Sequence, residues 1–247
     1  MNIHCTFAVV ERVLRQLRRD PRTLVLIFAV PPLLLWLVDG IFTNAPGTFD
    51  RVGPLMLGLF PFTLMFVITS IALLRERTQG TLDRLMASPI GRGDLVVGYA
   101  IAFALVALVQ SAITLVVGLG LLGLPNEGSL SLTVALVLGQ ALLGIALGLF
   151  LSAFARSEFQ AVQFLPAVVL PQVFLAGLLV PVDRLPRVLE GVARLLPLTY
   201  AFEALDRIMR QGRGLGDGRV GLDLAVLAGA LAILLVVGSL TLPRTEA

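Results

Sequence analysis

Six long apolar stretches constrain this 247-residue chain more than any other feature of its sequence. Each holds at least 19 residues. At a rise of about 1.5 Å per residue, a helix of that length crosses a hydrocarbon core of about 30 Å. The pattern predicts an all-α polytopic membrane protein, a single transmembrane domain over residues 1–247, whose six transmembrane helices lie at 24–42, 54–74, 95–124, 131–154, 159–180 and 222–242.

The composition excludes two other common classes of protein. Only 14% of the residues are charged and 57% are hydrophobic, whereas a soluble domain carries about 25% charged residues. A disordered chain needs the opposite balance, low hydrophobicity with high charge. The formal net charge of +3 does not indicate nucleic-acid binding, because we see no soluble module that could present a basic face.

Missing residue types exclude several kinds of chemistry on this chain. All 19 basic residues are arginine, and a P-loop ATPase or a Schiff-base enzyme needs a lysine. His4 and Cys5 are the only histidine and cysteine, which leaves no internal ligand set for a metal. The 16 acids are scattered, which argues against a lipid-modifying enzyme built on clustered carboxylates. We therefore expect no catalytic residue, metal site or cofactor here.

The N-terminal segment, residues 1–23, predicts an amphipathic helix that ends at Asp20-Pro21. Its basic polar face suits the headgroup layer, so we favour a helix on the cytoplasmic membrane surface. The alternative is a surface helix packed on protein. No A-x-A site follows the first apolar stretch, so we expect an uncleaved anchor. The apolar residues recur on one face at helical spacing: Val10, Val13, Leu14 and Leu17.

Arginine counts predict the orientation of the chain. An even number of spans places both termini on one side of the membrane. The segments on that side carry 11 arginines and the opposite segments carry 8, seven of them in residues 181–221. Because cytoplasmic loops are enriched in arginine and lysine, we predict cytoplasmic N and C termini.

Residues 75–94, between the second and third apolar stretches, form the most informative loop. We expect a short helix with a small apolar face, ended by Ser88-Pro89, and we expect Asp94 to cap the span that begins at Leu95. A few apolar side chains ringed by charge suit docking into a groove on another protein. The alternative is a solvated loop whose leucines lie in the interface. The apolar and the neighbouring polar residues are Leu82, Leu85 and Met86 beside Thr81, Asp83 and Arg84.

The loop at 181–221 predicts two half-length helices, each too short to cross the membrane and therefore re-entrant or interfacial. The first follows an apolar stripe from Leu185 to Leu196, with a Glu190–Arg194 pair. The second is expected to be capped by Thr199 and to run through Arg210. Its predicted ion pairs, at i,i+4 spacing, are Glu203–Arg207 and Asp206–Arg210.

Polar and helix-breaking residues inside the spans are candidates for a transport path. Glutamines within apolar helices need partners or water, and prolines five residues apart are expected to kink the fifth span. Ordinary helix packing explains these residues about as well. They are Gln110, Gln140, Gln163, Pro166, Pro171 and Gln172. Gly144, Gly148 and Ser152 form a small-residue face on the fourth span, which we assign to packing within the subunit.

Three blocks in order resemble motifs of the type-2 permease family of ATP-binding-cassette exporters, most closely its multidrug efflux branch. The first is Arg75-Glu-Arg-Thr-Gln-Gly-Thr-Leu-Asp-Arg-Leu85 with Ser88-Pro-Ile90. The second is Leu175-Ala-Gly-Leu-Leu-Val-Pro-Val182, and the third is Pro197-Leu-Thr-Tyr-Ala-Phe-Glu-Ala-Leu205. The resemblance covers nearly the whole chain. It departs from the family at Asp206, where relatives often have arginine and this chain has it at 207.

The resemblance implies roles for two of these blocks. The first would be a coupling helix that docks on the ATPase, and the third would belong to an outward-facing re-entrant cap made of Pro197, Thr199, Tyr200 and Glu203. The expected coupling residues are Arg75, Glu76, Arg77, Gly80, Thr81, Leu82, Asp83, Arg84, Leu85 and Met86.

The resemblance also implies partners and a location. It implies a permease in the bacterial cytoplasmic membrane that pairs with a second permease subunit, identical or paralogous, and with two copies of an ATPase subunit. That ATPase would hold ATP and Mg, and the substrate would be a hydrophobic or amphipathic drug, lipid or glycan-lipid among membrane lipids. The alternative is an ATP-independent small transporter or an accessory assembly subunit. Matching inverted repeats would support a secondary transporter, but the first and last three spans share no motif.

Overall fold

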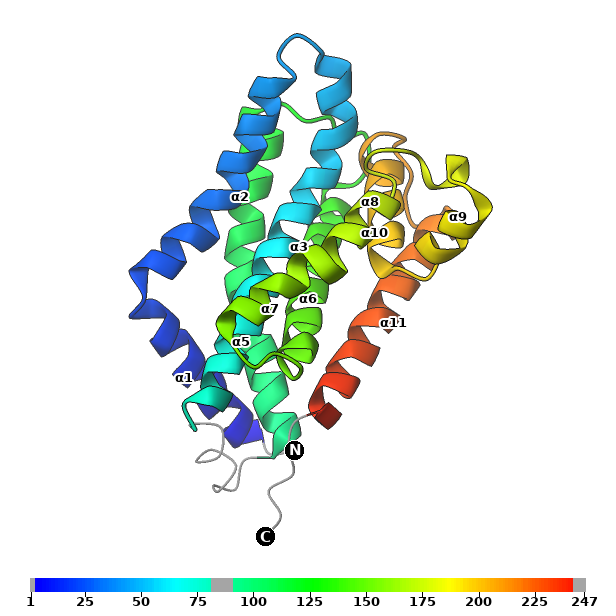
Figure 1. The fold of residues 1–247 in the computed structure, drawn as a ribbon. Helices are drawn as coiled ribbons and strands as arrows, with labels where there is room; N and C mark the ends of the chain where they lie inside the picture. Colours follow the sequence, from blue (N-terminus) through cyan, green and yellow to red (C-terminus); the bar gives the residue numbers. More distant parts are fainter. Residues whose placement is uncertain (1–2, 81–90, 242–247) are drawn as a thin grey trace.

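The computed structural model describes residues 3–80 and 91–241, and every regular element in these ranges is a helix (Figure 1). Six helical stretches there are long and apolar enough to cross a membrane, which confirms the six predicted spans by length and composition. The long α-helices are α2 (Pro21–Ile41), α3 (Pro46–Thr78), α5 (Arg92–Leu115), α6 (Leu130–Ser152) and α11 (Gly218–Thr241). The remaining span combines α7 (Glu158–Phe164), η2 (Leu165–Val169) and α8 (Leu170–Leu175).

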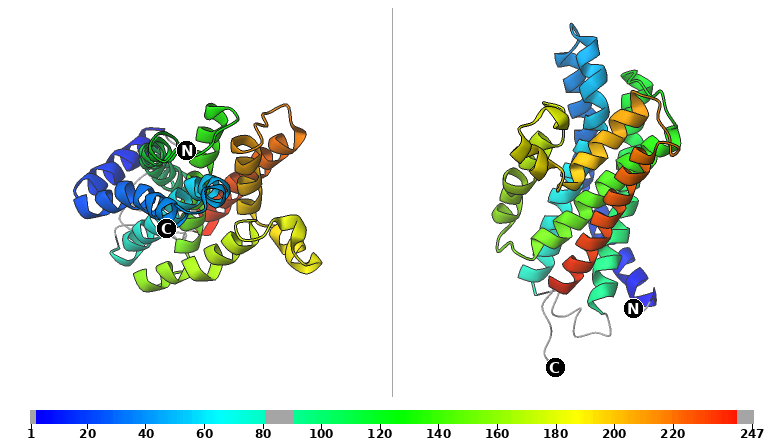
Figure 2. Two further views of the ribbon diagram at one scale, coloured as in Figure 1. Left: turned by 90° about the horizontal axis from the view of Figure 1, so that it is seen from above. Right: turned by 90° about the vertical axis from the view of Figure 1, so that its right-hand side faces the viewer.

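Helices α3 and α6 form the centre of the bundle. In each of them 61% of the most apolar 18-residue window is buried, whereas only 17% is buried in α2 and in α11. The outer helices therefore present apolar side chains to lipid or to another membrane helix. Viewed from above, α1 (Ile3–Arg18) and α2 lie on one flank and α9 (Arg187–Ala193), α10 (Pro197–Met209) and α11 on the other (Figure 2).

Small residues allow α3 and α6 to approach closely. A Cβ atom on Gly144 would lie 2.2 Å from the Phe62 carbonyl oxygen, and one on Gly148 would lie 2.2 Å from Thr69 Oγ1. Thr69 also donates a hydrogen bond to the Ile145 carbonyl oxygen of α6 at 3.4 Å. The small-residue face of the fourth span is therefore a packing surface within the chain, as we predicted.

The predicted break at Asp20-Pro21 is confirmed. Asp20 caps α2, accepting hydrogen bonds from the Thr23 N–H at 3.2 Å and the Thr23 hydroxyl at 2.6 Å. Helix α1 packs its apolar face on the protein, with Val9, Val10 and Val13 buried against residues of α5 such as Tyr99. That packing agrees with the alternative of a surface helix packed on protein, rather than with the favoured helix on the membrane surface.

Two π-helical turns interrupt the spans. Residues Val116–Leu121 (η1) continue α5, and η2 separates α7 from α8. Pro166 lies within η2, and Pro171 is the second residue of α8. Because proline has no N–H to donate, these residues disturb the α-helical hydrogen-bond ladder, and the fifth span is interrupted there by a π-helical turn. The predicted kink stays a prediction.

Two predicted helix starts are wrong. The sequence suggested a span beginning at Leu95, but α5 begins at Arg92, so Asp94 lies in its first turn and reaches back to accept the Gly91 N–H at 3.0 Å. Helix α10 begins at Pro197 rather than after a Thr199 cap, because proline suits the first helical position.

Candidate functional site

The last turn of α3 carries arginines that contact two other helices. Arg75 forms a two-pronged ion pair with Glu158 at the start of α7, with Nε–Oε1 at 2.7 Å and Nη2–Oε2 at 3.0 Å. Arg77 donates through Nη1 to the carbonyl oxygen of Ser152, the last residue of α6, at 2.7 Å. The forked guanidinium of Arg75 fixes the orientation as well as the distance between α3 and α7.

Glu76 connects the same turn of α3 to α1. Its side chain is only 8% exposed. Its carboxylate accepts hydrogen bonds from Arg12 Nη2 at 2.8 Å and from Gln16 Nε2 at 3.2 Å. Removing one partner of such a shielded pair leaves the other charge unpaired, which is costly. Polar contacts therefore hold the end of α3 to α1, α6 and α7.

The other predicted docking residues lie at or beyond the end of α3. Gly80 has a φ of +68°, in the left-handed region that glycine tolerates, and its N–H donates to the Arg77 carbonyl oxygen at 3.3 Å. It therefore terminates the helix. Thr81, Leu82, Asp83, Arg84, Leu85 and Met86 fall outside the described residues, and their docking role stays a prediction.

A mostly apolar pocket of about 450 Å³ lies beside this end of α3. Helices α1, α2, α3 and α5 line it, and Asp20, Arg75 and Glu76 are its charged lining residues. Cavities of this size admit drug-sized or acyl groups. Its apolar lining includes Leu17, Leu26, Leu64, Ile68 and Phe103. We call it the apolar pocket.

At the other end of the bundle, the predicted cap residues hold α10 to the end of α9. Thr199 is fully buried and its hydroxyl donates to the Ala193 carbonyl oxygen at 2.8 Å. Tyr200 donates from its hydroxyl to the Arg194 carbonyl oxygen, also at 2.8 Å. These bonds satisfy carbonyls that the short helix α9 leaves without an intrahelical partner.

Four charged side chains then form one connected network across α9, α10 and α11. Arg207 lies between two acids, pairing with Glu203 at 2.8 Å and with Asp223 of α11. Glu203 also pairs with Arg194 at 2.6 Å. Burial alone would lower the pKa of Arg207, but the carboxylates of Asp223 and Glu203 raise it above its ordinary value. Arg207 therefore stays cationic.

The network confirms some predicted pairs and replaces another. Glu203–Arg207 and Asp206–Arg210 form as predicted, the latter at 2.5 Å. The predicted Glu190–Arg194 pair is wrong, because Arg194 follows the last turn of α9 and reaches across to Glu203 instead. The Arg207–Asp223 pair does not follow from the i,i+4 spacing that predicts the other pairs. The available signal was an acid inside an apolar span, which needs a cationic partner.

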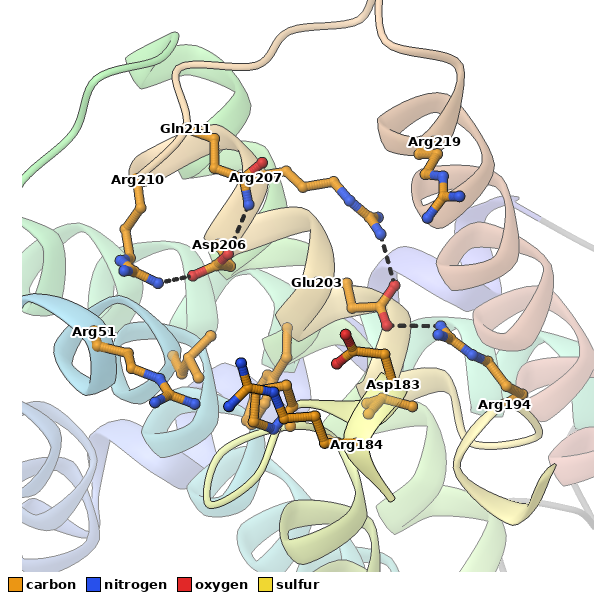
Figure 3. A pocket seen from close by; sticks show the side chains of 16 residues that line it. Arg51, Asp183, Arg184, Arg194, Glu203, Asp206, Arg207, Arg210, Gln211 and Arg219 are labelled. Carbon is orange, nitrogen blue, oxygen red and sulfur yellow. Dashed lines mark hydrogen bonds and ion pairs between the residues drawn. The ribbon is translucent and has the colours of Figure 1, made fainter. Parts of the chain in front are cut away.

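A pocket of about 550 Å³ opens beside this network (Figure 3). Its lining includes three acids, Asp183, Glu203 and Asp206. It is bounded by the first turns of α3, the 176–184 segment, α10 and the start of α11. Its lining carries six arginines: Arg51, Arg184, Arg194, Arg207, Arg210 and Arg219. We call it the arginine pocket.

The structure separates the candidate path residues into two groups. Gln110, Gln140 and Gln172 are buried, whereas Gln163, Pro166 and Pro171 are exposed. Gln140 donates to the Ala201 carbonyl oxygen at 3.3 Å, which ties α6 to α10. Gln172 donates to the Val168 carbonyl oxygen at 3.4 Å, within its own span, and both amide atoms of Gln110 lack a partner among the described residues.

Residues 4–209 match the family model described as ABC-2 type transporter. The chain is 31% identical over 197 residues to ABC transporter G family member 20 of Dictyostelium discoideum, an alignment covering 80% of this chain and 27% of that protein. It is 28% identical over 149 residues to the probable multidrug ABC transporter permease YbhR of Escherichia coli (strain K12), covering 60% of this chain and 40% of that protein.

A further similarity is to the linearmycin resistance permease protein LnrN of Bacillus subtilis (strain 168), 26% identical over 174 residues. That alignment covers 68% of this chain and 45% of the relative. The chain therefore spans less than half the length of each of these three relatives.

Proposed function

This chain belongs to the ABC-2 type transporter family, and on that premise we propose that it is the membrane-spanning permease subunit of an ATP-binding-cassette exporter. The observation that carries the proposal is the way in which the last turn of α3 is held. Arg75, Glu76 and Arg77 fix it to α7, α1 and α6. The docking motif follows directly in the chain, so a force applied there would reach several helices together.

The proposed mechanism depends on these polar contacts at the last turn of α3. A separate ATPase dimer closes on ATP and pushes the coupling segment, and α3 transmits the displacement to α1 through Glu76 and to the fifth span through Arg75. The chain supplies no lysine for a P-loop, so ATP and Mg are assigned to the ATPase. The permease itself contributes positioning and a route, and no catalytic residue.

We propose a hydrophobic or amphipathic cargo, such as a drug, lipid or glycan-lipid, moved outward. Two observations support this class: relatives named as multidrug and linearmycin-resistance permeases, and the apolar pocket beside the coupling end. An apolar molecule that partitions into the membrane can reach such a pocket from the lipid. The acids Asp20 and Glu76 in its lining would face a polar end group on the cargo.

The proposal places the chain in the bacterial cytoplasmic membrane with cytoplasmic termini. The start of α1, the end of α3 and the end of α11 lie at one end of the bundle (Figure 1), as docking to a cytoplasmic ATPase requires. A second permease subunit, identical or paralogous, would cover apolar side chains that α2 exposes. These include Val25, Leu33, Trp36 and Ile41.

Co-purification tests the central assignment. The tagged chain is purified from its native membranes, and the associated ATPase is identified and quantified. Leu82→Asp, or reversal of both charges at Asp83 and Arg84, should lower recovery of the ATPase at least about tenfold while the permease remains folded. Leu215→Asp is the matched control, since Leu215 is 64% exposed and lies at the opposite end of the bundle.

Two outcomes would count against the proposal. Undiminished ATPase recovery and transport in the Leu82 and Asp83/Arg84 variants would refute the docking assignment. Recovery of no nucleotide-hydrolysing partner with the unaltered chain would favour the ATP-independent alternative.

A further inference from the structure

The arginine pocket carries more positive charge than its own acids neutralise. Its lining has six arginines and only three acids. Arg194, Arg207 and Arg210 are committed to ion pairs with Glu203, Asp206 and, in the case of Arg207, also Asp223. The positive charge left over therefore resides on the other three arginines, against which Asp183 supplies one negative charge.

Those three are Arg51 of α3, Arg184 of η3 (Val182–Arg184) and Arg219 of α11. None of them forms an ion pair with a carboxylate in the described part of the chain. Asp217 accepts the backbone N–H of Arg219 at 2.9 Å, but its ion pair is with Arg213. Three guanidinium groups from three separate elements therefore line one pocket, and in the described part of the chain the carboxylate of Asp183 is the one lining acid that is not engaged in the ion pairs above (Figure 3). The pocket keeps a surplus of positive charge.

Apolar side chains complete the lining. Leu55, Val182 and Phe202 border the pocket together with Ala176 and Gly177. A bound molecule would therefore meet guanidinium groups on one part of the wall and aliphatic or aromatic carbon on another. The volume of about 550 Å³ lies within the usual range for sites that hold a small organic ligand.

We infer that the arginine pocket binds a phosphate ester that bears a net negative charge and an attached apolar or glycerol group. Guanidinium groups match phosphate oxygens with paired hydrogen bonds. The oxygens of a phosphate ester are arranged tetrahedrally, so donors on separate elements can approach them from different sides, whereas the two oxygens of a carboxylate lie in one plane. The ligand is either the headgroup of an anionic phospholipid or a water-soluble phosphate ester. Binding requires no ATPase, so the inference stands apart from the proposed transport function.

The test uses the full chain in neutral detergent and in lipid nanodiscs. Phosphatidylglycerol is the lipid probe, glycerol phosphate is the soluble probe, and phosphatidylcholine is the zwitterionic comparison. Native mass spectrometry counts retained lipid, and a thermal shift titration gives the Kd for glycerol phosphate. The pocket variant replaces Arg51, Arg184 and Arg219 by Gln.

A control variant with the same change in charge replaces Arg22, Arg156 and Arg187 by Gln. All three are exposed, and none lines the arginine pocket. The pocket variant should weaken binding of the retained probe at least about tenfold, and the control should leave it within about twofold. The single substitutions Arg51→Gln and Arg184→Gln should each give an intermediate loss of probe affinity. Because each removes only one exposed arginine, the fold should be retained, and a graded loss then reports on binding rather than on unfolding.

Each outcome decides the inference. Retention of phosphatidylglycerol that the pocket variant alone loses supports it with a lipid source, and binding of glycerol phosphate alone supports it with a soluble source. Equal binding by the pocket and control variants overturns it. Equal retention of phosphatidylcholine and phosphatidylglycerol, or binding of neither probe, also overturns it.

Discussion

Replacing Asp223 by Asn should destabilise the folded chain by about 3 kcal/mol, because it leaves Arg207 with only one of its two carboxylates. The Asp223 side chain is 2% exposed and that of Arg207 is 15% exposed. Removing one partner of a buried ion pair costs about 3–5 kcal/mol. The lower end applies here, since Glu203 still pairs with Arg207 at 2.8 Å.

A double-mutant cycle isolates the pair. Asp223→Asn, Arg207→Gln and the double variant are unfolded reversibly with SDS in mixed micelles, and the free energies of unfolding are compared. We expect a coupling free energy of about 2 kcal/mol, because the double variant leaves neither charge buried without its partner. The pair Asp206–Arg210 provides the control: its side chains are 30% and 38% exposed, so its coupling should stay below about 1 kcal/mol.

The comparison between the two cycles refutes or supports the reasoning. If both cycles gave the same coupling, burial would not set the strength of the Arg207–Asp223 pair, and the network would not hold α10 against α11 as described. A larger coupling for Arg207–Asp223 at unchanged helix content would support it.

Three further predictions follow from the fold. Gly148→Val should destabilise the chain by about 3 kcal/mol or more, because a side chain there collides with the α3 backbone. Gly229 has open space around it, so the control Gly229→Val should cost under about 1 kcal/mol. Thermal unfolding in detergent measures both variants. Glu76→Gln should leave ATPase recovery within about twofold of the unaltered chain and lower transport per ATP several-fold, measured with the co-purified complex, because it loosens α1 from α3. In cells whose permease lacks its natural cysteine, a cysteine at Leu215 should react with an impermeant maleimide and one at Gln79 should not; the reverse pattern would invert the orientation.

The sequence alone was sufficient for the span count and for the helix break at Asp20-Pro21. Both depend on local features. The length of an uninterrupted apolar run is read directly from the sequence, and proline breaks a helix because its own nitrogen has no N–H to donate. The packing of Gly144 and Gly148 was also predictable, because small residues four apart on an apolar helix permit close approach to a neighbour.

The ion network was beyond reach of local reasoning. Its Arg207–Asp223 pair joins residues 16 apart in the chain, across the connection from α10 to α11, so no i,i+4 rule finds it. The i,i+4 spacing pairs Arg194 with Glu190, but in the folded chain Arg194 pairs with Glu203 on the neighbouring helix α10. The arginine pocket was equally hidden, since α3, η3 and α11 meet only in the folded chain.

The most direct test of the central claim is ATP-driven uptake of an amphipathic fluorescent compound into inside-out vesicles. The vesicles contain the chain alone, the chain with its co-purified ATPase, or the chain with that ATPase after its P-loop lysine is replaced. We predict ATP-dependent accumulation only when the chain and the active ATPase are both present. Accumulation by the chain alone, or with the inactive ATPase, would contradict the assignment of the energy source to a separate subunit.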